Sequence, residues 1–63
     1  MKINVKRILA EQAKQKKSNA EICDLLSIPR TRYSSILRAG ACQVVTLGRI
    51  ADALGVDPGE LIL

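Results

Sequence analysis

The stretch that decides the fold is residues 18–38, SNAEICDLLSIPRTRYSSILR. Ser18 is followed three residues later by Glu21, and this spacing predicts a helix start, because the serine oxygen can accept from the Glu21 amide while the Glu21 side chain reaches back. Ile22 then opens the apolar positions of that helix. Pro29 has a fixed φ and no N–H, so it fits only the first turn of a helix. The segment therefore predicts two short helices joined by a tight turn, the second beginning at or just before Pro29.

The second of these helices, residues 29–38, has two unlike faces. Tyr33, Ile36 and Leu37 recur at helical spacing and predict an apolar stripe. The opposite face carries short polar and basic side chains: Thr31, Ser34, Ser35 and Arg38, with Arg30 and Arg32 flanking its start. It carries no carboxylate, which is unusual for a solvated helix face, and the short side chains would let the helix approach another surface closely. Gly40 predicts the C-terminal stop.

These features resemble the helix-turn-helix of the phage repressor and Cro family, also called the XRE family. The similarity lies in the capping Ser18 with the amide Asn19, the small Cys23 inside the first helix, Ile28 after the turn, and the anchors Tyr33 and Ile36. It continues through residues 46–56, TLGRIADALGV, which look like the family's fourth helix, and residues 3–15 would be its first. The chain departs from the family at Ser27, where glycine is usual, at Asn19, where glutamine is usual, and at residues 37–40, where a glutamate-any-glycine ending is common.

The resemblance implies an all-α fold: one lambda-repressor-like domain over residues 1–63, a compact bundle of five short helices, with the motif at about residues 18–38 formed by the second and third. It also implies a sequence-specific regulator of transcription, expected to be a repressor, that reads the major groove of double-stranded DNA with residues 29–38. The expected DNA contacts are Ser18, Asn19, Arg30, Thr31, Arg32, Ser34, Ser35, Arg38 and Gln43.

Most of the expected contacts have a chemical reason of their own. Arg30 and Arg32 suit guanine O6 and N7 or flanking phosphates, Thr31 suits a thymine methyl, and Ser35 would reach a base edge one turn on. Ser18 and Asn19 lie at a helix N-terminus, which suits a phosphate, and Arg38 and Gln43 would hold the backbone. The alternatives are simply solvated arginines, a protein-interaction adaptor or antitoxin module with the same fold, or an oligomer built on the apolar C-terminal end.

Charge is unevenly distributed along the chain. The net charge is +4, and no acidic residue occurs between Asp24 and Asp52. A second basic group, Lys14, Lys16 and Lys17, precedes the motif, whereas the C-terminal part holds Asp52, Asp57 and Glu60. One face is therefore expected to be positive, and duplex DNA attracts such a face without regard to sequence. The lysine group has an equally good second interpretation, as cations that complement a helix dipole.

The composition of the chain argues against several other functions, including catalysis, metal binding and membrane insertion. The chain has no histidine, and Cys23 and Cys42 are far apart, so no zinc-type set, cofactor site or catalytic constellation is expected, and we expect no enzyme. Two cysteines without a secretory signal suggest a reducing cytoplasm, with Cys23 a small core residue and a Cys23–Cys42 disulfide the less favoured alternative. The single aromatic, Tyr33, argues against single-strand binding by stacking. No apolar run reaches the length of a membrane span, and no small-molecule ligand is indicated.

The flanking segments complete the expected bundle. Asn4 is the expected cap of the first helix, whose inward stripe would be Val5, Ile8, Leu9 and Ala13. A helix before Gly55 would bury Leu47, Ile50, Ala51 and Leu54, with Val44 one turn earlier. Asp57 and Pro58 predict a last short helix from Pro58 to about residue 62.

A homodimer is also expected, because regulators of this type bind two half-sites about one helical turn apart. Leu61, Ile62 and Leu63 are three consecutive apolar residues that so short a helix cannot bury alone, and they are the expected self-contact. The alternative is that Leu61 and one neighbour fill the core while the rest fray.

Overall fold

Four α-helices and one 3-10 turn make up the computed structural model, which describes residues 1–63. The elements are α1 (Val5–Gln15), α2 (Asn19–Leu26), α3 (Arg30–Ala39), α4 (Val44–Leu54) and the 3-10 turn η1 (Pro58–Leu61). The expected all-helical architecture is confirmed, but the fifth helix is only the four-residue turn η1. The Asp57 side chain caps it by accepting from the Gly59 amide at 2.7 Å, and the chain leaves it at Ile62 in an extended conformation. No helix is both long and apolar enough to cross a membrane.

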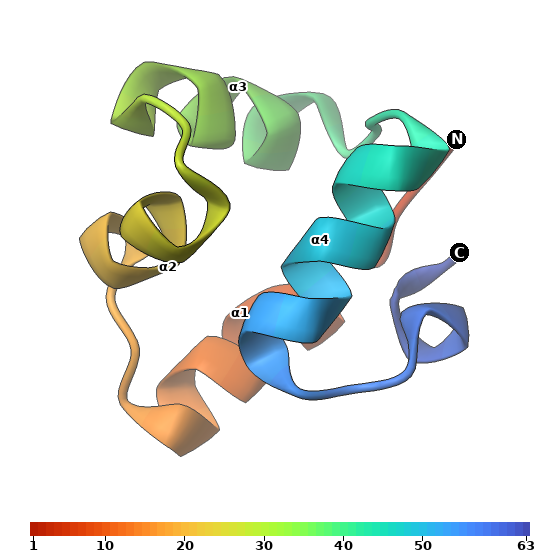
Figure 1. Ribbon diagram of the computed structural model, residues 1–63. Helices are drawn as coiled ribbons and strands as arrows, with labels where there is room; N and C mark the ends of the chain where they lie inside the picture. The colour runs from red at the N-terminus through yellow and green to blue at the C-terminus, as the bar shows by residue number, and fades with distance from the viewer.

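Helix α4 lies at the centre of the molecule and contacts α1, α2 and η1, whereas α3 lies across one end and contacts mainly α2 (Figure 1). Twelve apolar residues form one buried cluster: Ile3, Ile8, Ile22, Cys23, Leu26, Tyr33, Ile36, Leu47, Ile50, Ala51, Leu54 and Leu61. The predicted inward stripe of α4 is confirmed except for Val44, which is exposed. At 100° per residue, Val44 lies at the edge of the stripe that Leu47 and Ile50 define, and it occupies the first turn, where fewer neighbours surround it.

Helix α1 buries a face that overlaps the predicted one only in part, since Val5 packs against the core as expected but other predicted residues do not. The Asn4 side chain caps it by accepting from the Arg7 amide at 3.0 Å, as expected. Ile8 is fully buried, but Leu9 and Ala13 are exposed, and Glu11 and Gln12 are buried in their place. The prediction for Leu9 and Ala13 was wrong because the inward stripe of α1 passes from Ile8 onto polar side chains, which a search for apolar periodicity does not follow.

The helix ends follow the predicted caps with one shift. The capping box of α2 is present: the Glu21 amide donates to the Ser18 hydroxyl at 3.2 Å, and the Ser18 amide donates to the Glu21 carboxylate at 3.2 Å. Pro29 is the N-cap of α3, so the helix begins at Arg30, one residue later than predicted. Gly40 and Gly55 end α3 and α4 in the left-handed region, and Lys16 and Ser27 do the same for α1 and α2.

The two ends of the chain lie side by side (Figure 1). Ile3 pairs with Ile62 in an isolated antiparallel bridge, and the Asn4 amide donates to the Leu61 carbonyl at 2.7 Å. Leu61 is fully buried, while Ile62 is 44% and Leu63 77% exposed. Cys23 is buried and Cys42 half-buried, and both are free thiols, so the less favoured disulfide is absent.

Candidate nucleic-acid interface

Helix α3 exposes most of its surface. Of its ten residues, only Tyr33 and Ile36 are buried. The nine residues predicted to contact DNA are all exposed: Ser18, Asn19, Arg30, Thr31, Arg32, Ser34, Ser35, Arg38 and Gln43. The face is therefore accessible to a partner along the length of α3.

A hydrogen-bonded network fastens α3 and α2 to α1. The Tyr33 hydroxyl donates to Gln12 Oε1 at 2.5 Å, and Gln12 Nε2 donates both to Asn19 Oδ1 at 2.9 Å and to the Lys17 carbonyl at 3.2 Å. Every polar group of the Gln12 side chain thus has a partner, which is what its burial requires. Burial raises the pKa of Tyr33 to about 12, with a smaller contribution from Cys23. Sequence reasoning missed Gln12, although its place one turn after Ile8 is a signal for an inward position.

The exposed side chains of α3 divide into a central stripe and two edges. At 100° per residue, Thr31, Ser34, Ser35 and Arg38 lie opposite the buried Tyr33 and Ile36. Arg30 and Arg32 lie 160° apart around the helix, one on each edge of this stripe. Arg30 and Arg32 were predicted to have the same role, but they face different surroundings.

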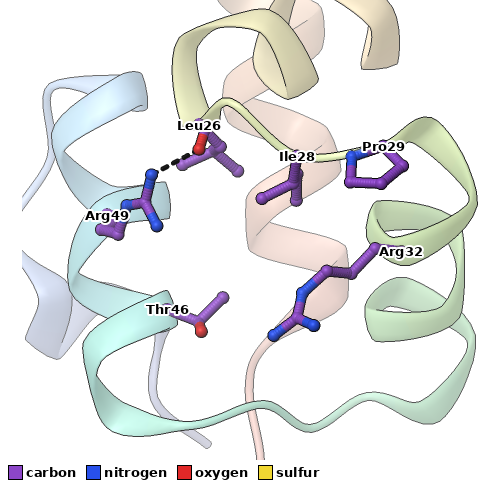
Figure 2. Close-up of a pocket in the computed structure, with 6 residues that line it drawn as sticks. All are labelled: Leu26, Ile28, Pro29, Arg32, Thr46 and Arg49. Carbon is purple, nitrogen blue, oxygen red and sulfur yellow. Dashed lines mark hydrogen bonds between the residues drawn. The ribbon is translucent and has the colours of Figure 1, made fainter.

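Arg32 points toward α4. It shares a hollow of about 300 Å³ with Thr46 and Arg49 (Figure 2). Arg49 donates to the Leu26 carbonyl at the end of α2. In the sequence, Arg49 stood out only as one charge in an acid-free stretch, because its partner lies on another helix and no local pattern reveals such a contact.

Ser18 and Asn19 lie apart from the stripe, at the far end of α2. The eight residues of α2 place them about 12 Å along its axis from the turn that leads into α3. The Ser18 hydroxyl serves the capping box and Asn19 Oδ1 accepts from Gln12, so their side-chain oxygens are engaged. The backbone amides of the first turn remain the donors available to an anion there.

Gln43 is the N-cap of α4, but its side chain makes no capping hydrogen bond. It is exposed beside Val44 and Val45, which are 65% and 73% exposed. Just before it, burial raises the pKa of the Cys42 thiol, although the N-terminal ammonium opposes this effect. Gln43 is therefore free to contact a partner, but two apolar side chains adjoin it.

No carboxylate neutralises the arginines of this region. The two salt bridges of the structure both involve Arg7, with Glu11 at 3.7 Å and Glu60 at 3.5 Å. Lys17, by contrast, donates to the Ala53 carbonyl near the C-terminal end of α4 at 2.9 Å. Lys17 therefore contacts the C-terminal end of α4, and not the end of α1, the helix that precedes it, where the sequence suggested that it complements the dipole. The arginines of α3 and α4 therefore carry charge that no carboxylate neutralises, as do the exposed Lys14 and Lys16.

Comparison with models of known protein families, with curated proteins and with solved structures finds no match to this chain.

Proposed function

We propose that this protein is a sequence-specific regulator of transcription that binds double-stranded DNA, of the repressor/Cro type, with α3 as the recognition helix. The observation that carries the proposal is the exposed face of α3, which combines hydroxyls and arginines and has no acidic side chain. Small donors and acceptors allow a helix to lie deep in the major groove, where each base pair presents a distinct pattern.

The central stripe of α3 would read bases. Thr31 lies in the first turn, where the N-terminal part of a recognition helix meets base edges, and Ser34 and Ser35 follow one turn later. Arg30, on the edge away from α4, has the length and the planar fork to take guanine O6 and N7 in a bidentate contact. Arg38, in the last turn, would contact the backbone.

The remaining predicted residues would position the helix. The Asn19 backbone amide, next to the capping Ser18 at the start of α2, and the exposed side-chain amide of Gln43 suit phosphates on either side of the groove. The simplest regulatory consequence is repression, in which an occupied site excludes other proteins from the same DNA.

Selection of bound duplexes from a random pool tests the proposal directly. We expect one short sequence to be enriched, and binding to it to weaken steeply with salt, with a slope of about −4 in log K against log salt for roughly four to five neutralised phosphates. An unenriched pool together with salt-independent binding would contradict the proposal.

One observation favours a second function, a protein-interaction module of the adaptor or antitoxin kind. Val44 and Val45 are exposed at the start of α4, directly after the predicted contact residue Gln43. An interface centred on these valines would bury apolar surface, so its affinity would change little with salt. The salt dependence of binding therefore discriminates between the two functions.

A further inference from the structure

The hollow between α3 and α4 has an unusual lining. Arg32 enters it from α3 and Arg49 from α4, from opposite sides, with the Thr46 side chain between them (Figure 2). Leu26, Ile28 and Pro29 form the rest of the wall. Two cations therefore face one space of about 300 Å³, although like charges repel and neither has a carboxylate within salt-bridge distance.

The structure holds one of these arginines in place. Arg49 donates to the Leu26 carbonyl, which leaves its remaining N–H groups for another acceptor. Asp52, one turn further along α4, lies with Arg49 on a neighbouring hollow and forms no ion pair with it. The guanidinium is thus oriented by a backbone carbonyl, and its charge is uncompensated.

We propose that this hollow is a binding site for a phosphate group, held by Arg32, Thr46 and Arg49. A guanidinium offers paired donors that match the oxygens of an oxyanion, and a threonine hydroxyl adds one more donor. A carboxylate has two oxygens in one plane, which a single guanidinium can satisfy. Donors that converge from opposite sides and from a third residue suit a tetrahedral group better. The phosphate is either part of the DNA backbone beside α3 or a free phosphate ester.

The first arm of the test uses inorganic phosphate, with sodium chloride at matched ionic strength as the reference. Two-dimensional ¹⁵N spectra that include the arginine Nε signals should show saturable shifts at Arg32, Thr46 and Arg49. Arg32→Gln and Arg49→Gln should each weaken binding by about tenfold or more, the effect of one hydrogen bond to a charged group. Arg30→Gln removes the same charge from the other edge of α3 and should leave the binding unchanged.

The Arg32 side chain makes no hydrogen bond within the protein, so Arg32→Gln should fold even if Arg49→Gln does not, and a thermal melt checks this. Phosphate shifts of equal size in Arg32→Gln and in the parent would overturn the proposal. Shifts spread evenly over all lysines and arginines would overturn it as well.

The second arm identifies the source of the phosphate and rests on the proposed DNA binding. A backbone phosphate in the hollow should make the salt slope of duplex binding shallower by about one in Arg32→Gln. Lys6→Gln is the control, because it removes an exposed charge from α1 and should leave the slope unchanged. An unchanged slope together with lost inorganic-phosphate binding assigns the hollow to a free phosphate ester. A parent that binds inorganic phosphate there but no duplex would contradict the proposed function and leave the phosphate site standing.

Discussion

Tyr33 links the core to the exposed face. Its ring is fully buried, and its hydroxyl reaches Gln12 on α1, which in turn holds Asn19 at the start of α2. One side chain therefore sets the position of α3 relative to two other helices. Changes at Tyr33 should affect the stability of the whole domain, whereas changes at the exposed residues of the same helix should affect only what it binds.

Tyr33→Phe should destabilise the protein by about 1–3 kcal/mol at neutral pH, because it leaves the buried Gln12 oxygen without its donor. The folded-state pKa of Tyr33 is about 12, above the ordinary value of 10.0. The stability that follows from this shift is complete below pH 10 and is lost as the pH rises toward 12, an effect of about 3 kcal/mol. Urea melts at pH 7, 9 and 11 measure the difference in stability between the parent and Tyr33→Phe. This difference should be the same at pH 7 and 9 and smaller at pH 11. A constant difference between the two across this range would contradict the assignment.

Arg30→Ala should weaken binding to the selected duplex by about 1–3 kcal/mol and relax the preference at one base position, because a bidentate base contact is lost. Arg32→Ala should also weaken binding, but equally for all sequences, since its edge of α3 faces the phosphate hollow. Binding titrations against the selected duplex and single-base variants measure both effects. Full affinity and specificity in both variants, with unchanged melting, would refute the recognition role of α3.

At the scale of the element, few buried residues hold α3 in its place. Tyr33 and Ile36 are its only buried residues, and its main neighbour is α2. The turn between α2 and α3 also depends on one residue, Ser27, and on its backbone conformation. Ser27 ends α2 with φ of 57°, in the left-handed region that glycine occupies without strain.

Ile36→Ala should lower the free energy of unfolding by roughly 2–5 kcal/mol, since it removes one of the two anchors of α3 and leaves a cavity. In so small a domain that could be most of the stability. Ser35→Ala, on the adjacent exposed residue, should change stability by less than about 0.5 kcal/mol. Thermal and urea melts of both variants test this, and an Ile36→Ala variant that melts like the parent would show that α3 is anchored elsewhere.

Ser27→Gly should stabilise the protein by about 0.5–1 kcal/mol, the relief of left-handed strain less the greater freedom of glycine in the unfolded chain. Ser27→Val is the matched contrast and should destabilise, because a β-branched residue fits this conformation worst. If Ser27→Gly melts below the parent, the serine must stabilise the turn in some way other than its backbone conformation.

The elements of this fold follow from local sequence more closely than the contacts between them. Ser18 with Glu21, Asn4, Gly40 and Gly55 each act within a few residues, so spacing alone predicts the helix ends that they define. Two hydrogen bonds join different helices: Tyr33 to Gln12, 21 residues apart in sequence, and Arg49 to Leu26, 23 residues apart. No local periodicity in the sequence predicts such contacts. The exposure of Thr31, Ser34, Ser35 and Arg38 followed from periodicity. The different surroundings of Arg30 and Arg32, in contrast, depend on where α4 lies.

At the scale of the whole molecule, exposed apolar surface lies at the paired chain ends. Ile62 and Leu63 are exposed there, and Asp57 and Glu60 are close by in the chain. A single recognition helix reads few base pairs, so two copies related by a two-fold axis would read a longer site. The paired ends are where we expect the second copy to contact the first.

Sedimentation at micromolar concentration, alone and with a palindromic duplex, should therefore detect a dimer. Ile62→Glu should dissociate it, while Leu9→Glu, at a residue of nearly equal exposure on α1, should not. A monomer that binds the duplex at one-to-one stoichiometry would exclude the dimer. A dimer that survives Ile62→Glu would place the interface elsewhere.

The pairing of Asn4 with Leu61 also bears on the order in which the core closes during folding. The Asn4 amide donates to the Leu61 carbonyl and Ile3 forms a backbone bridge with Ile62, so the segment before α1 has these partners only when residues 61 and 62 are in place. Contacts between residues so far apart in sequence form late, because the intervening chain must first be closed into a loop. We therefore expect the helices to form before this contact, and the domain to become stable as one cooperative unit only when the contact closes.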